Sequence, residues 1–196
     1  MTRPRPRMIV GISGATGINY GVRLLQVLRA LEVETHLVVS SPGEMTRDYE
    51  TDLSAGELRE LADHSYKPTD FGAAISSGSF RTMGMIVVPC TVRTVSEIAY
   101  GTTSNLLTRA ADVCLKERRR LVLAVRESPF SLVHLRAMTA ATEAGAIIAP
   151  PVPAFYAKPN SLAEMIDHTV GRLLDLFEIE NALAPRWGET REGGDA

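Results

Sequence analysis

The sequence predicts an α/β protein: a three-layer α/β/α sandwich around a mostly parallel sheet of about six strands joined by right-handed crossovers. Two observations predict this fold. Short apolar runs of strand length alternate along the chain with longer segments whose apolar residues recur at helical spacing. Several of these runs also end in glycine, hydroxyl or charged residues, as the strands of an open parallel sheet do at their carboxyl ends.

The individual elements follow from the same patterns. Strands are expected at residues 8–10, 33–39, 85–89, 121–125 and 146–149, where β-branched and other apolar residues cluster. Helices are expected at residues 18–31, 43–52, 54–62, directly after Cys90, and at 105–117, 132–144 and 161–177. Ser54 and Ser161 each stand three residues before a glutamate, which is the capping-box pattern of a helix start. The prolines within residues 150–159 predict an extended segment, and residues 76–81 form a serine-rich loop.

A glycine-rich turn follows the first strand. Gly11, Gly14 and Gly17 allow the backbone to turn sharply, and the N–H groups at the next helix start can then bind an anion. Their spacing is not G-x-G-x-x-G, so a dinucleotide fingerprint is not supported. The sequence therefore favours a phosphate loop here, with a simple tight turn as the alternative.

Three further strand ends carry candidate ligand contacts. Ser40 follows the second strand, where it is either a contact or a helix cap. Thr91, Arg93 and Thr94 follow the strand at 85–89 and suit a phosphate or a flavin edge, the alternative being a threonine cap beside a surface arginine. Arg126 and Glu127 follow the strand at 121–125, where a charged pair at the ligand edge favours a functional role.

Composition narrows the class of protein. The chain has 196 residues, 45% of them hydrophobic, which fits one domain with a sizeable core. A formal net charge of -2 gives no reason to expect nucleic acid. We expect no membrane segment, because no apolar stretch is long enough to span a bilayer. The expected organisation is a basic flexible N-terminus at residues 1–7, one domain at 8–180, and a C-terminal arm and tail at 181–196 that includes Trp187.

Cysteine and histidine usage is sparse. Cys90 and Cys114 have no C-x-x-C spacing, so reduced thiols in the cytoplasm are expected, and Cys90 is expected to be a small buried residue rather than a nucleophile. The four histidines, His36, His64, His134 and His168, show no metal-ligand spacing. We expect no metal.

Taken together, the segments closely resemble the UbiX family of flavin prenyltransferases over residues 8–187. The residues that carry the resemblance are GISGATG (11–17), ETD (50–52), ISSGSF (75–80), PC (89–90), RAADV (109–113), LKERR (115–119), VRE (125–127), PAFY (153–156) and RW (186–187). So many motifs in the order of the family make the resemblance specific.

The resemblance implies a Rossmann-like, FMN-binding subunit that assembles as a homo-oligomer, usually a dodecamer. It implies transfer of a dimethylallyl group from dimethylallyl phosphate to reduced FMN, with N5 and C6 of the flavin alkylated in turn. The prenylated FMN would pass to a separate UbiD-type decarboxylase, so no decarboxylation is expected from this chain.

The resemblance also assigns roles to individual residues. It implies FMN contacts at Gly14, Ala15, Thr16, Ser40, Thr91, Val92, Arg93, Thr94 and Arg126. It implies prenyl-phosphate contacts at Lys116, Glu127, Tyr156 and Arg172. Thr16 and Glu50 are expected to assist proton movement at the flavin. Glu127 is expected to give a proton to the departing phosphate, because a phosphate leaves more easily with positive charge and a proton donor close by.

Three positions depart from the common family pattern. Thr16 stands where many members have serine, Arg93 where lysine is frequent, and Val125 where proline is frequent. These changes bear on rates and donor choice more than on reaction type. Two alternatives stay open: a non-catalytic FMN carrier or accessory subunit of an aromatic acid decarboxylase, and an FMN-dependent peptidyl-cysteine decarboxylase. The second is disfavoured because P-A-S-A-N is absent at residues 89–93.

Overall fold

A computed structural model describes residues 5–184 of the chain. The chain divides into two compact units, Met1–Pro151 and Val152–Ala196, which are described separately below. Trp187 and the rest of the predicted C-terminal arm and tail beyond residue 184 lie outside the described residues. Within the described part of the chain, no helix is both long and apolar enough to cross a membrane.

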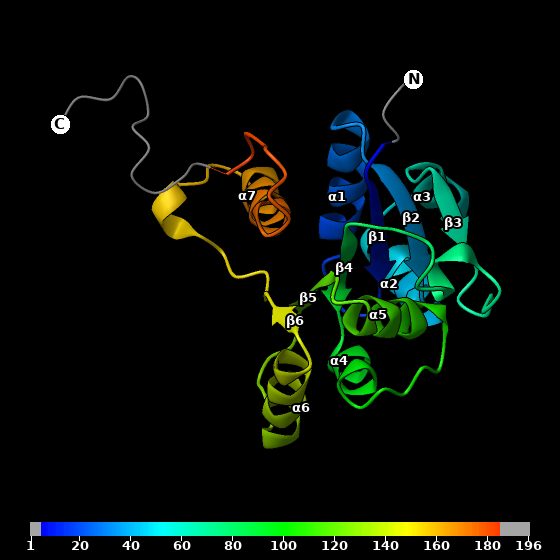
Figure 1. The fold of residues 1–196 in the computed structure, drawn as a ribbon. Helices are drawn as coiled ribbons and strands as arrows, with labels where there is room; N and C mark the ends of the chain where they lie inside the picture. Colours follow the sequence, from blue (N-terminus) through cyan, green and yellow to red (C-terminus); the bar gives the residue numbers. More distant parts are fainter. Residues whose placement is uncertain (1–4, 185–196) are drawn as a thin grey trace. The chain divides into compact units, whose positions relative to one another are not determined.

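The first unit is built on one six-stranded, fully parallel sheet, which confirms the predicted α/β class (Figure 1). Its strands are β1 (Arg7–Ile12), β2 (Glu34–Val39), β3 (His64–Tyr66), β4 (Gly84–Cys90), β5 (Arg120–Val125) and β6 (Ala146–Ile148). They lie in the order β3-β2-β1-β4-β5-β6. This is the doubly wound, Rossmann-type order, in which the chain changes direction between β1 and β4 and leaves a crevice at the carboxyl ends of those two strands.

Helices pack on both faces of the sheet. Successive residues of β1 point to opposite faces. At Gly11 a Cβ would lie 3.2 Å from Leu107 of α5 (Leu106–Lys116), whereas Ile12 packs against Gly21 of α1 (Ile18–Ala30). Helix α1 therefore covers one face and α5 the other, which gives the three layers that the sequence predicts.

The remaining helices of the first unit begin at polar caps. They are α2 (Ser41–Glu50), α3 (Ala55–Glu60), α4 (Val92–Ala99) and α6 (Leu132–Glu143). Ser54 and Glu57 form the predicted capping box at α3, because the serine oxygen accepts from the Glu57 N–H and the Glu57 carboxylate accepts from the Ser54 N–H. Gly145, at φ 107°, follows the end of α6 as expected for a left-handed glycine.

Two short elements of the first unit were not predicted from the sequence. Strand β3 has only three residues and extends the sheet at an edge, and the 3₁₀ turn η1 (Ala74–Ser76) precedes the serine-rich loop. Strand β3 lacks an apolar run because its residues are His64, Ser65 and Tyr66.

The second unit contains a 3₁₀ turn, η2 (Phe155–Ala157), and the amphipathic helix α7 (Leu162–Asp175). Ser161 caps α7 by accepting a hydrogen bond from the Glu164 N–H at 3.2 Å, as predicted. Segment 181–184 folds back onto the helix, because a Cβ on Gly171 would lie 2.8 Å from Asn181 Oδ1 and 3.1 Å from Ala184 Cβ.

Candidate functional site

A cavity of about 330 Å³ opens at the carboxyl edge of the sheet, beside the ends of β1, β2 and β4. It is lined by Ser13, Gly14, Ser40, Ser41, Pro42, Pro68, Thr69, Thr91, Val92, Arg93, Thr94, Glu97, Ser104 and Asn105. This is the place where a sheet of this strand order binds its ligands. The structure therefore brings six of the predicted cofactor contacts together: Gly14, Ser40, Thr91, Val92, Arg93 and Thr94.

Buried hydrogen bonds of Ser13 tie the ends of β1 and β4 together. Its hydroxyl donates to the Pro89 carbonyl at 3.0 Å and accepts from the Thr91 N–H at 2.8 Å. The side chain is almost fully buried, so these bonds are shielded from water. As a result, the turns after the two strands face the same cavity.

Gly14 is required at the wall of this cavity. A Cβ at this position would lie only 2.4 Å from Pro42 Cβ, at the start of α2. The carbonyl carbon of Pro42 would lie 3.0 Å from the same Cβ, so a side chain of any size would force the turn after β1 away from α2.

Ser40 and Thr91 turn out to be helix caps as well as cavity residues. Ser40 Oγ accepts from the Gly43 N–H at 3.1 Å, and Thr91 Oγ1 accepts from the Thr94 N–H at 3.1 Å. Thr91 Oγ1 and Thr94 Oγ1 also lie 2.9 Å apart. Because a hydroxyl that accepts a capping bond still carries a hydrogen of its own, the capping role and the ligand-contact role are compatible.

The anion at the start of α1 is the carboxylate of Glu50. Its Oε2 accepts hydrogen bonds from the N–H groups of Gly17 at 2.8 Å and Ile18 at 3.0 Å. This side chain thus supplies the negative charge that a helix N-terminus favours. The phosphate predicted for this turn must therefore use other N–H groups than those two. Thr16, which is exposed, lies in the same turn.

Glu97 and Ser104 line the cavity, although the sequence did not predict them as site residues. Glu97 accepts from Arg93 Nε at 2.9 Å and from the Ser104 hydroxyl at 2.6 Å. The Arg93 side chain is 79% exposed, so its guanidinium stays accessible while one edge is held. Glu97 could have been predicted, because it lies one helical turn after Arg93 and can pair with it. Ser104 could not, because it reaches the cavity only when the chain folds back before α5.

The predicted prenyl-phosphate residues of the first unit lie at opposite edges of the sheet. Glu127 follows β5 at the carboxyl edge, where its carboxylate accepts from the Ser128 N–H at 3.0 Å, and Arg126 donates its backbone N–H to the Cys90 carbonyl. Lys116 ends α5 just before β5 begins, so it lies at the amino edge. The structure therefore does not place Lys116 beside the cavity of its own chain.

In the second unit, Tyr156 contacts His168, which lies one helical turn before Arg172. The Tyr156 hydroxyl lies 3.2 Å from His168 Nε2, and His168 precedes Arg172 by one turn of α7. Burial, together with the positive charge of Arg172, lowers the pKa of His168. Arg172 also donates to Asp175 at 2.6 Å, so its guanidinium is oriented on the helix surface.

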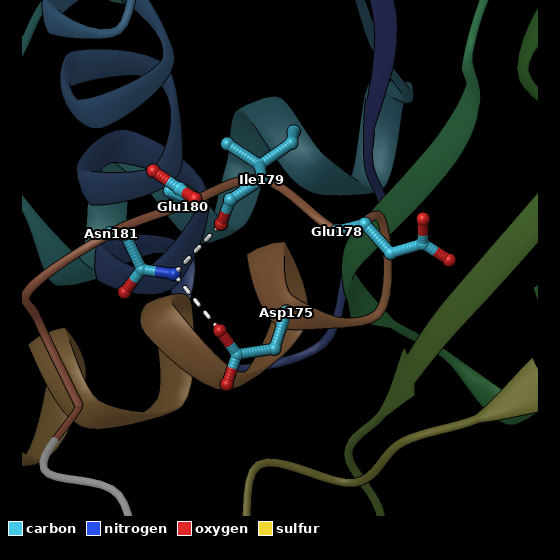
Figure 2. Close-up of a pocket in the computed structure, with 5 residues that line it drawn as sticks. All are labelled: Asp175, Glu178, Ile179, Glu180 and Asn181. Carbon is cyan, nitrogen blue, oxygen red and sulfur yellow. Dashed lines mark hydrogen bonds between the residues drawn. The ribbon is translucent and has the colours of Figure 1, made fainter.

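A second cavity, of about 500 Å³, lies at the turn after α7 and has the wrong chemistry for a phosphate ligand. It is lined by Asp175, Glu178, Ile179, Glu180 and Asn181 (Figure 2). The Asn181 amide donates to Asp175 Oδ1 and to the Ile179 carbonyl, both at 3.1 Å. Three carboxylates repel an anion, and none of the predicted site residues lines this cavity.

Neither cysteine is activated. Burial raises the pKa of the Cys90 thiol far above its usual range, and raises that of Cys114 to about 12 against the opposing charge of Arg119. The prediction that Cys90 is a buried packing residue is confirmed.

The structure brings together one histidine cluster that the spacing of histidines does not reveal. His36 and His64 are register partners on β2 and β3, and potential ligand atoms of both lie within 4.8 Å of one another and of Glu34. Glu34 Oε1 already accepts from Arg7 Nε at 3.0 Å and lies 3.0 Å from His36 Nε2. The cluster is therefore a hydrogen-bonded network at the amino edge, and the absence of a metal from the protein stays a prediction.

Comparison with known proteins identifies the family. The model of the Flavoprotein family matches residues 2–185. The flavin prenyltransferase UbiX of Escherichia coli (strain K12) is 56% identical over 184 residues, covering 92% of this chain and 97% of that protein. The chain belongs to the flavin prenyltransferases of the Flavoprotein family.

Two solved structures of similar proteins extend the comparison. AnUbiX (PadA1), in complex with FMN and dimethylallyl pyrophosphate, has a TM-score of 0.93 at 50% identity and covers 96% of this chain and 100% of its own. A dodecameric FMN-dependent UbiX-like decarboxylase from Escherichia coli O157:H7 has a TM-score of 0.90 at 49% identity, covering 92% and 98%.

The cavity at the carboxyl edge fits the flavin that the family implies. Val92, Pro42 and Pro68 supply apolar wall for a ring system, and the hydroxyls of Ser40 and Thr91 supply hydrogen-bond donors. The accessible guanidinium of Arg93 is suited to a phosphate group. These residues would hold FMN, which provides the prenyl-accepting ring.

Proposed function

We propose that this protein is a flavin prenyltransferase that transfers a dimethylallyl group from dimethylallyl phosphate to reduced FMN and forms prenylated FMN. The observation that carries the proposal is the likeness to a relative solved with FMN and dimethylallyl pyrophosphate, at 50% identity over 96% of this chain. The cavity at the Rossmann-type switch point agrees with it, since its hydroxyl, guanidinium and apolar groups suit FMN.

The turns at the carboxyl edge hold FMN in this proposal. The contacts are Gly14, Ala15, Thr16, Ser40, Thr91, Val92, Arg93, Thr94 and Arg126. The hydroxyl bonds of Ser13 hold the turn after β1 against the end of β4 before the flavin arrives, which lowers the entropic cost of binding it. Thr16, in the turn before α1, and Glu50, whose carboxylate accepts from the N–H groups at the start of that helix, assist proton movement at the bound flavin.

A second set of residues acts on the prenyl phosphate. Breaking the allylic C–O bond leaves negative charge on the phosphate, and the cationic groups of Lys116 and Arg172 stabilise that charge. Glu127 gives the departing phosphate a proton, and Tyr156 orients it. The contact of Tyr156 with His168, one helical turn before Arg172, supports a joint role for Tyr156 and Arg172.

The placement of Lys116 supports a homo-oligomer. Within one chain this lysine lies at the amino edge of the sheet, whereas the cavity opens at the carboxyl edge. A similar protein at 49% identity is described as dodecameric. Lys116 therefore acts in the cavity of a neighbouring copy, and the complete site requires more than one chain.

The product points to a recipient enzyme. Prenylated FMN is a modified cofactor that a flavin prenyltransferase does not itself consume, and we assign a UbiD-type decarboxylase as its recipient. Adding the protein, reduced FMN and dimethylallyl phosphate to an apo-decarboxylase of that type should restore decarboxylation.

We also place the reaction in the cytoplasm, where the two buried thiols stay reduced.

Substitutions at the prenyl-phosphate set test the proposed roles. Arg172→Ala and Glu127→Gln should retain FMN binding but lower turnover about 100-fold or more, because they remove charge stabilisation and the proton donor respectively. FMN affinity and steady-state prenyl transfer are measured side by side. Glu143 is an exposed acid at the end of α6, so Glu143→Gln serves as the control for Glu127→Gln. It should leave FMN affinity and turnover unchanged. Normal turnover in Arg172→Ala and Glu127→Gln would reject the assignment of the phosphate site.

A further inference from the structure

The loop at residues 77–80 is hydrogen-bonded to the segment that directly follows α5. Arg119 donates from Nη1 to the Phe80 carbonyl at 2.7 Å and from Nη2 to the Gly78 carbonyl at 2.5 Å. One residue earlier, the Ser76 carbonyl accepts from Arg109 Nε at 3.3 Å. Because Arg109 on α5 and Arg119 just after it hold three alternate carbonyl groups, at residues 76, 78 and 80, the loop has a fixed position relative to the end of that helix.

The Lys116 ammonium rests against Gly78 of this loop. Lys116 Nζ lies 2.6 Å from Glu117 Oε1. A Cβ on Gly78 would lie 2.9 Å from Lys116 Nζ and 2.1 Å from Glu117 Oε1. Any residue other than glycine at this position would therefore displace the ion pair.

The need for glycine comes from these two side chains and not from the backbone. Gly78 is not among the residues with a positive φ, so its backbone accepts an alanine without strain. At Gly56, in contrast, the nearest atom to a Cβ is 3.8 Å away, and an alanine meets only ordinary contact. The two positions form a matched pair for substitution.

We propose that Gly78 is a positioning residue for Lys116: the missing side chain lets the loop hold the lysine ammonium, paired with Glu117, at one place at the amino edge. A lysine side chain has four rotatable bonds and loses much freedom when it binds an anion. Holding it against the loop beforehand reduces that loss at the moment of binding. This inference rests on the proposed role of Lys116 at the prenyl phosphate.

The first test compares Gly78→Ala with Gly56→Ala. Gly78→Ala should raise the KM for dimethylallyl phosphate about tenfold, the effect of one weakened charge-assisted contact, while FMN affinity and the melting temperature stay close to those of the wild type. The melting temperature is preserved because the new methyl group meets only the ends of two flexible side chains. Gly56→Ala should change neither the KM nor the FMN affinity, and it should not lower the melting temperature, because it replaces a helical glycine where a methyl group meets only ordinary contact.

A double-mutant cycle separates positioning from a general effect on the fold. In a Lys116→Met background, adding Gly78→Ala should have no further effect on KM, since the group that it displaces is already gone. Arg119→Gln removes the hydrogen bonds that hold the loop without adding an atom near Lys116, and it should raise the KM for dimethylallyl phosphate as well. If Gly78→Ala does not fold, Arg119→Gln replaces it in the test.

The outcomes distinguish this inference from the proposed function. An active wild type with an unchanged KM in Gly78→Ala, or an undiminished effect of Gly78→Ala in the Lys116→Met background, overturns the positioning role alone. A wild type that forms no prenylated FMN under the same conditions overturns the proposed function, and the positioning role with it.

Discussion

A single carboxylate oxygen of Glu50 accepts hydrogen bonds from two N–H groups at the start of α1. At the scale of the residue, this geometry combines a structural duty with the proton-handling role that we propose for the same group. The family resemblance, carried in part by the ETD motif, implied a functional glutamate here, whereas the capping contact depends on α2 returning to the start of α1 and cannot be found from local spacing.

Two substitutions separate the duties of Glu50. Glu50→Gln keeps a carbonyl oxygen that can accept from both N–H groups, so stability should fall by less than about 1 kcal/mol, while prenyl transfer should slow strongly for lack of a proton-accepting carboxylate. Glu50→Ala removes the cap as well and should cost about 1 kcal/mol or more in unfolding free energy. Urea unfolding and turnover are measured on both variants. Wild-type turnover in Glu50→Gln would assign Glu50 a capping role alone.

At the scale of the element, edge strand β3 is an element that local sequence patterns did not predict. Its three residues have no apolar run, and side-chain bonds hold this end of the sheet instead. Asp63, next to the strand, accepts from the Thr35 N–H at 2.8 Å and from Arg5 Nη1 at 2.9 Å. Burial raises the pKa of Asp63, but the hydrogen bonds from Arg5 and Thr35 outweigh it and lower the pKa to about 2.

This depressed pKa predicts a pH-dependent contribution to stability. Because the folded carboxyl has a lower pKa than the unfolded one, its stabilisation is present above the unfolded value of about 4 and is lost as the pH falls through that value toward 2. Asp63→Asn should therefore lower the unfolding free energy by about 1–2 kcal/mol at pH 7, and by progressively less below pH 4. Urea unfolding across pH measures the difference, with the exposed Asp52→Asn as control. A constant difference from pH 7 to pH 3 would contradict this account.

Local patterns predicted most of the elements because each long helix and each buried strand carries its own signal. The candidate site was predicted only where it follows strand ends: Ser40, Thr91 and Arg93 come directly after apolar runs. Glu97 and Ser104 were missed because they enter the cavity from the side of a helix and from a returning loop. The pairing of His36 with His64 was missed because it depends on strand register, which periodicity does not determine.

At the scale of the whole molecule, the strand order determines what one chain can do alone. The order β3-β2-β1-β4-β5-β6 places the flavin cavity at the carboxyl edge, and the connection from α5 to β5 leaves Lys116 at the opposite edge. The family resemblance implied that these groups work together but not that they belong to opposite edges, because the direction of a crossover helix is a property of the topology. We therefore expect the active form to contain several copies of the chain.

The mass of the flavin after anaerobic incubation tests the central claim most directly. Purified protein is incubated with reduced FMN and dimethylallyl monophosphate, and the bound flavin is released and weighed by mass spectrometry. The account predicts a flavin heavier by one five-carbon prenyl unit. An unchanged flavin mass, with FMN binding confirmed in the same sample, would contradict it and would favour a protein that only carries FMN.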